Sequence, residues 1–322
     1  MKYQDIPEKI IRRFAKQKEI KNLRGKQVEE IIDLLIKADF SSELEYLNDQ
    51  FSFSGKIGGL IIDKPINEFP VKDENRFIEN LIEKNLIIND ALNEKKWVIR
   101  YDDNIQICGI TLDGQSVFLR TVERRTNTYS TGWNNKGQND YAYFSSIIIH
   151  FSNQVIEYRC PITYVNKYQK FILPLLGYES SKVESMRLTK LSPTDAENVK
   201  TKLKATYSAT HISTPSSVGS IKFTSLNSTI DLATDTNMQK IMTALGGVVP
   251  TDDHLDVVCY LPDYIDPRTK LSLPFSFEIN MKSGGLKFLG SSLVTQSAID
   301  HVVETIIQVS YIDKLDNSMV SV

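Results

Sequence analysis

The chain has 322 residues, of which 41% are hydrophobic and 24% are charged, a balance that is typical of a globular protein and argues against a disordered or fibrous class. The formal net charge is −2, so the chain lacks the overall positive charge of many nucleic-acid-binding proteins. The charge is unevenly distributed, however. Residues 1–26 contain nine Lys/Arg against three Asp/Glu, whereas residues 231–322 contain six against twelve.

The cysteines Cys108, Cys160 and Cys259 are widely spaced and form no CxxC motif. We therefore expect buried, free thiols in a reducing cytoplasm of bacterial type, rather than disulfides or a zinc site. The chain contains no run of about 18 apolar residues and no apolar segment near its start. These observations predict a cytoplasmic protein that makes no use of a membrane.

An amphipathic helix is predicted over residues 6–18, with Pro7 in its first turn. One face carries the apolar residues Ile6, Ile10, Ile11 and Phe14. The opposite face is basic and consists of Lys9, Arg12, Arg13 and Lys16. Four cations at helical spacing can lie along a phosphate backbone and bind it without base specificity. An ordinary solvated face is the alternative interpretation.

Two further helices are expected at residues 28–36 and from Ser42, and another near Asp73. Together they predict a helical bundle over residues 1–95, and its continuity with the next segment stays open. An antiparallel sheet is expected over residues 96–180, with strands at 97–101, 105–112 and 116–123. Asp113-Gly114 is a strong hairpin turn signal between the last two strands.

The densest apolar β-branched run, Ile147-Ile148-Ile149, lies within residues 141–165, which are expected to form two central strands of this sheet. The preceding segment, residues 124–140, has no apolar periodicity and predicts a long exposed loop or the tip of an extended hairpin. Its cations and aromatics suit either stacked bases or a protein interface. They are Arg124, Arg125, Tyr129, Trp133 and Lys136.

A smaller α+β domain is expected over residues 181–322. Ser192-Pro193 predicts the start of a helix that runs to about Tyr207, and residues 208–220 are expected to form a polar linker or a mobile loop. Strands follow at 255–261, 275–281 and 286–289, and a long helix at 297–312 closes the domain. The predicted fold class is therefore α+β: an N-terminal helical bundle, an antiparallel β-sheet, and a smaller α+β domain closed by a C-terminal helix.

The usual enzyme motifs are missing, since the sequence contains no GxGxxG, GxxxxGK[ST], HExxH or GxSxG pattern. No cofactor and no metal are therefore expected. Asp256, Glu278 and Lys282 loosely approximate the carboxylates and lysine of a metal-dependent nuclease, without its tight Glu-x-Lys spacing. Solvated strand charges are the stronger interpretation, and whether the chain is an enzyme stays open.

The sequence favours a non-catalytic binding protein, with nucleic acid, DNA or RNA, as the expected partner. The basic helix face and the basic, aromatic segment at 124–140 are the expected contact surfaces. One alternative is a divalent-metal-dependent nuclease or hydrolase that uses Asp256, Glu278 and Lys282. A second alternative is a protein–protein adaptor that presents its acidic C-terminal domain to a basic protein partner.

Overall fold

The structure is a computed structural model, and it describes residues 3–54, 59–130, 132, 136–179, 183–214, 219–245, 254–290 and 294–315. Its internal contacts divide the chain into two compact units. Unit 1 combines Met1–Ile57 with Leu188–Val322, and unit 2 comprises Gly58–Arg187. The fold is α+β, as predicted, and both sheets are antiparallel.

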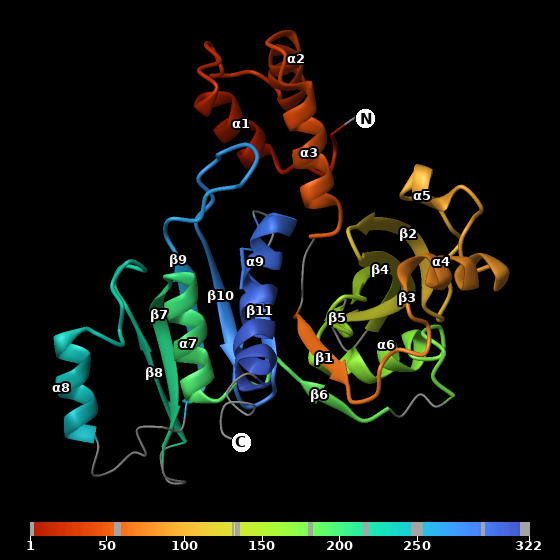
Figure 1. The fold of residues 1–322 in the computed structure, drawn as a ribbon. Helices are drawn as coiled ribbons and strands as arrows, with labels where there is room; N and C mark the ends of the chain where they lie inside the picture. Colours follow the sequence, from red (N-terminus) through yellow and green to blue (C-terminus); the bar gives the residue numbers. More distant parts are fainter. Residues whose placement is uncertain are drawn as a thin grey trace. The chain divides into compact units, whose positions relative to one another are not determined.

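Unit 1 contains an N-terminal group of helices and a five-stranded sheet with the order β11-β10-β9-β7-β8 (Figure 1). The helices are α1 (Glu8–Gln17), α2 (Val28–Lys37), α3 (Ser41–Ser52), α7 (Pro193–Leu203), α8 (Thr236–Leu245) and α9 (Gln296–Ile307), which continues as the π-helical segment η3 (Gln308–Ile312). The strands are β7 (Thr206–Ser213), β8 (Ser220–Thr224), β9 (His254–Leu261), β10 (Phe275–Asn280) and β11 (Gly285–Leu289).

Alternation along β10 shows which face of this sheet forms the core. Phe275, Phe277 and Ile279 are buried, whereas the residues between them are partly exposed. The closing helix α9 buries a continuous apolar stripe that includes Val302 and Ile306. The predicted C-terminal helix and the predicted β10–β11 hairpin are both confirmed.

The N-terminal helices share one core with a distant part of the chain. Ile10, Phe14 and Leu35 pack in the same buried cluster as Leu271 and Leu273, which lie in the segment between β9 and β10. Hydrophobic periodicity located the helices correctly, but it contained no signal for this long-range packing. The bundle is therefore built on the C-terminal half of unit 1.

Unit 2 contains a six-stranded sheet with the order β2-β3-β4-β5-β1-β6. Its strands are β1 (Ile61–Pro65), β2 (Gln106–Asp113), β3 (Ser116–Ser130), β4 (Lys136–His150), β5 (Val155–Arg159) and β6 (Ser185–Arg187). Its helices are α4 (Glu74–Glu83), α5 (Ala91–Glu94), α6 (Val165–Ile172) and the short 3-10 helix η1 (Ile162–Tyr164).

The isoleucine run lies at the centre of this sheet, as predicted. Strand β4 pairs with β3 on one side and β5 on the other, and Ile147, Ile148 and Ile149 are fully buried. Ile147 and Ile149 pack in one apolar cluster with residues of α4 and α6, among them Phe77 and Ile172. The Asp113-Gly114 turn also forms as predicted, because Asp113 pairs with Ser116 across it.

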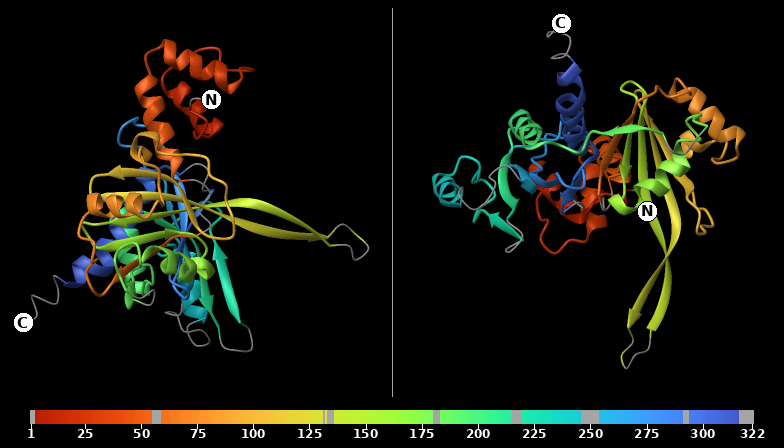
Figure 2. Two further views of the ribbon diagram at one scale, coloured as in Figure 1. Left: turned by 90° about the vertical axis from the view of Figure 1, so that its right-hand side faces the viewer. Right: turned by 90° about the horizontal axis from the view of Figure 1, so that it is seen from below.

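The segment at 124–140 extends the hairpin of β3 and β4 well beyond their neighbours. The pairing continues from Arg124 opposite Ala142 to Ser130 opposite Lys136, and among the described strands no third one pairs with either side there. Figure 2 shows this two-stranded projection leaving the rest of the unit 2 sheet. We call residues 124–130 and 136–142 the β-arm. Of the two predicted forms, the structure selects the extended hairpin.

Three local predictions are wrong. Residues 97–101 form no strand, since only Trp97 donates a backbone hydrogen bond to Cys108 there. The helix that starts at Ser192 ends at Leu203, because Lys204 adopts a left-handed conformation. The first six residues of the segment expected to be a polar linker, 208–213, belong to strand β7, which pairs with both β8 and β9.

Candidate functional site

The exposed face of α1 carries the predicted cations, and they fall into two groups. Lys9 and Lys16 lie in the middle of the face and are exposed, and within the described part of the chain neither one pairs with a carboxylate. Arg12 and Arg13 lie at its two edges. Each residue advances 100° around an α-helix, so the four cations fall in the order Arg12, Lys16, Lys9 and Arg13 across the face. The structure brings all four to one surface, as the spacing predicts.

Arg12 contacts the backbone beside α1. Its Nη2 donates a hydrogen bond to the carbonyl oxygen of Lys26 at 2.8 Å, and its Nη1 donates one to that of Leu23 at 3.5 Å. Its Nε pairs with the carboxylate of Glu8 at 2.7 Å. Arg12 therefore fixes the 23–26 segment against the helix, and this segment adds the cations Arg24 and Lys26.

Arg13 contacts a different segment on the other edge. Its Nη1 donates to the carbonyl oxygen of Ser272 at 3.0 Å, and Gln17 donates to that of Lys270 at 3.0 Å. The segment before β10 thus lies beside α1 and contributes Arg268 and Lys270, both exposed. Sequence reasoning missed these two cations, since nothing local connects residue 13 with residue 272.

We call this surface the basic surface of unit 1. It combines residues from three segments of the chain: Lys9, Arg12, Arg13, Lys16, Arg24, Lys26, Arg268 and Lys270. Its apolar support is the buried side of α1, where Ile10 and Phe14 are almost completely inaccessible. Cations from separate segments on one support create a local region of positive potential.

The pair α2 and α3 resembles a DNA-reading helix pair in connection length only. The two helices are joined by the three residues Ala38, Asp39 and Phe40. The second helix of such a pair normally enters the major groove. Here that helix contains Glu43, Glu45 and Asp49 and no Lys or Arg. Its negative charge opposes insertion beside phosphates, so α3 lacks the charge of a DNA-reading helix.

The two arginines at the base of the β-arm are occupied by contacts within unit 2. Arg124 forms a bidentate ion pair with Asp103, with N–O distances of 2.8 and 3.0 Å. Hydrogen bonds from Arg124 lower the pKa of the Asp103 carboxyl below its ordinary value. Arg125 has only 14% of its side chain exposed and pairs with Glu123, which also binds Lys167.

Both faces of the β-arm carry exposed side chains. Tyr129 is 49% exposed and Tyr141 is 42% exposed, and Lys136 is exposed as well. Trp133, the aromatic residue predicted at the tip, lies outside the described residues. The β-arm therefore presents its tyrosines to solvent, whereas Arg125 is positioned to hold its base.

The candidate catalytic residues lie on and beside β9 and β10. Asp256 is opposite Asn280, so its side chain lies on the same sheet face as Glu278 but one row away. The Asp256 carboxylate contacts His211 Nδ1 at 2.9 Å. Lys282 follows β10 in an exposed turn. Among the described residues, no three His, Cys, Asp or Glu side chains converge as metal ligands.

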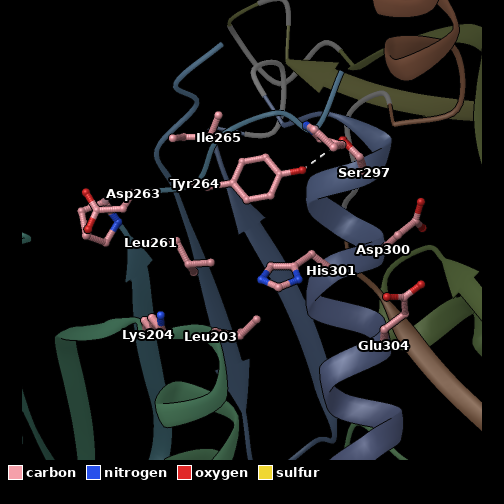
Figure 3. Close-up of a pocket in the computed structure, with 12 residues that line it drawn as sticks. Leu203, Lys204, Leu261, Asp263, Tyr264, Ile265, Ser297, Asp300, His301 and Glu304 are labelled. Atoms are coloured by element: carbon pink, nitrogen blue, oxygen red, sulfur yellow. Dashed lines mark hydrogen bonds between the residues drawn. The ribbon is translucent and has the colours of Figure 1, made fainter. Parts of the chain in front are cut away.

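A pocket of about 630 Å³ lies between α9 and the segment after β9 (Figure 3). Tyr264 donates a hydrogen bond from its hydroxyl to Ser297 Oγ at 3.0 Å, and its ring faces that of His301 with centroids 6.0 Å apart. The lining includes Asp263, Asp300 and Glu304 but only one lysine, Lys204. This acidic lining would repel the negatively charged backbone of a nucleic acid.

The three cysteines lie in the interior of the protein. All three are free and buried, as predicted. Burial raises the pKa of the Cys160 thiol to about 12, so it is protonated and unreactive at neutral pH. None of the described helices combines the length and apolar composition needed to cross a bilayer.

Comparison with known proteins assigns the chain to no family, because no protein-family model and no curated protein matches it.

Proposed function

We propose that the protein binds nucleic acid through the basic surface of unit 1, as a cytoplasmic, non-catalytic protein. The observation that supports this best is the convergence of three basic segments on α1, where Arg12 and Arg13 fix the flanking backbone. Their contacts leave Lys9 and Lys16 exposed in the middle of the surface. This arrangement suits recognition of the phosphate backbone rather than base edges.

The spacing of the two central lysines fits this role. They are seven residues apart, which corresponds to about 10 Å along an α-helix. Phosphates follow one strand of a duplex at about 3.4 Å per step along its axis, so the two ammonium groups span about three steps. Binding would release condensed counterions and would therefore weaken as salt rises. The expected binding is independent of sequence.

The test is a charge reversal at the central lysines. Lys9→Glu combined with Lys16→Glu should weaken binding to a 20-base-pair duplex by at least about ten-fold, which is about 1.4 kcal/mol. Stability should stay within about 1 kcal/mol of wild type, because exposed charges contribute little to it. Fluorescence anisotropy with a labelled oligonucleotide measures the affinity, and urea unfolding measures the stability.

A matched control distinguishes an effect of the basic surface from an effect of overall charge. Lys190→Glu combined with Lys240→Glu changes the charge of unit 1 by the same amount at exposed positions elsewhere. This control should retain near-wild-type affinity. Equal losses in both double variants would mean that only overall charge matters, and unchanged affinity in the α1 variant would reject the basic surface as the binding site.

A further inference from the structure

One face of the β-arm carries a ladder of aromatic and amide side chains. In antiparallel pairing, opposite residues share a face, and so do residues two apart along a strand. Tyr141 is opposite Arg125, Asn127 is opposite Asn139, and Tyr129 is opposite Gly137. These pairs form three successive rows on one face, about 7 Å apart.

Gly137 determines how the outermost tyrosine lies. A Cβ atom at position 137 would stand 2.6 Å from Cζ and 2.8 Å from the hydroxyl oxygen of Tyr129. The ring therefore rests directly on the backbone of the opposite strand, in space that every other residue type would occupy. Because Tyr129 is nevertheless 49% exposed, its free side faces solvent as a flat platform.

The base of the ladder is held rigidly. The guanidinium carbon of Arg125 lies 3.3 Å from the ring centroid of Tyr143 and 3.8 Å from that of Tyr164. Tyr164 belongs to η1, which leads into α6, so this stack joins the β-arm to the rest of unit 2. A two-stranded ribbon is only marginally stable alone in water, and this anchor offsets that weakness.

From these contacts we infer that this face of the β-arm stacks unpaired bases of a nucleic acid, one on Tyr129 and one on Tyr141. The Asn127 and Asn139 amides lie between the two rings, where they can hydrogen-bond base edges. The inference rests on the proposed function and adds unpaired nucleotides, bound by the β-arm, to the phosphate backbone bound by the basic surface. Stacking on aromatic rings is tolerant of sequence, because every base has a π-face.

The chemistry of this face favours unpaired bases over its alternatives. In a duplex, the π-faces of the bases are covered by their neighbours, so an exposed ring gains no stacking partner. A docked protein would be expected to meet an apolar centre surrounded by a polar rim. The described ladder instead places two amide side chains at its middle, between the aromatic rows.

The test compares a labelled 12-residue oligo(dT) with a duplex of equal length in the full-length protein. Tyr129→Ala and Tyr141→Ala should each weaken oligo(dT) binding by between about 5-fold and about 150-fold, with little change for the duplex. Gly137→Ala should weaken it too, because the new methyl group displaces the Tyr129 ring. Tyr129→Phe should retain wild-type affinity, since stacking needs no hydroxyl.

Thr128→Ala is the matched control, because Thr128 lies on the opposite face of the same ribbon. It should bind oligo(dT) like wild type, and melting temperatures should show that all the variants fold. Unchanged oligo(dT) affinity in the tyrosine variants would overturn the inference. A β-arm that docks a protein instead of nucleic acid would give this result. If these variants bind normally while the Lys9/Lys16 variant does not, only the inference fails. A wild-type protein that binds neither oligonucleotide would overturn both proposals.

Discussion

The guanidinium of Arg12 donates a hydrogen bond to the backbone carbonyl oxygen of Lys26 over 2.8 Å, across fourteen positions of sequence. Arg12 and Lys16 lie on the same face of α1, yet they differ in role. Arg12 is partly buried and fixes the chain, whereas its neighbour Lys16 is exposed. Positive charge on this surface therefore serves both folding and the proposed binding.

Arg12→Ala should lower the free energy of unfolding by about 1–2 kcal/mol, because it removes hydrogen bonds to two carbonyl groups. Lys16→Ala should change it by less than about 0.5 kcal/mol, since that side chain is exposed and contacts no carboxylate among the described residues. Urea unfolding of both variants measures the difference. Equal effects of the two substitutions would contradict the division of roles on α1.

Ile147→Ala should destabilise the protein by about 2–5 kcal/mol, because it creates a cavity at the centre of the unit 2 sheet. Ile147 is fully buried in a cluster that includes Leu119 and Tyr158. Ile66→Ala is the matched control, since Ile66 is 63% exposed and should lose less than about 0.5 kcal/mol. Thermal or urea unfolding that shows similar stability for both variants would place Ile147 outside the core.

The elements that sequence predicted best are those with strong local signals. The isoleucine run of β4 and the Asp113-Gly114 turn depend on side chains next to one another in the chain, and both form as expected. The four cations of α1 share a face for the same reason. The contribution of Lys270 to that surface depends on contacts with Gln17, and periodicity cannot reveal such distant contacts.

Strand β7 was missed because two of its buried residues, Ser208 and Thr210, are small and hydroxylated. Ser208 and Thr210 are at most 9% exposed, but they resemble linker residues in composition. Their hydroxyl groups are satisfied inside the protein, with Ser208 donating to the carbonyl oxygen of Val258 and Thr210 contacting His254 Nδ1 at 2.9 Å. Such pairing makes polar burial tolerable, and only the assembled sheet supplies it.

Acid should weaken unit 2 through Glu157. Burial by itself would raise the pKa of its carboxyl, but Arg159 at 2.6 Å and His150 at 3.4 Å outweigh burial and lower that pKa. A lowered folded-state pKa contributes stability above the ordinary carboxyl value of about 4.3, and this contribution is lost as pH falls through the lowered value.

Urea unfolding between pH 7 and pH 3 measures this effect. Glu157→Gln should be less stable by about 3–5 kcal/mol at pH 7, because Arg159 stays buried without its carboxylate. The gap between variant and wild type should narrow below about pH 4. A gap that stays constant down to pH 3 would show that the Glu157 charge does not stabilise the fold.

Cys160 should be inert in the native protein. Because burial raises the pKa of its thiol to about 12, almost none of it is thiolate at pH 8. A thiol-specific chromogenic reagent should label it only after denaturation, with a rate that follows unfolding. Rapid labelling of Cys160 in the native state, identified by mass spectrometry, would contradict its burial.

The salt dependence of binding tests the central claim most directly. The affinity of wild type for a duplex should fall log-linearly with salt concentration, with a slope of about −0.9 for each phosphate that is neutralised. Lys9→Ala combined with Lys16→Ala should make this slope shallower by about 2, because two phosphate contacts are lost. Identical slopes in wild type and in this double variant would contradict binding through the basic surface of unit 1.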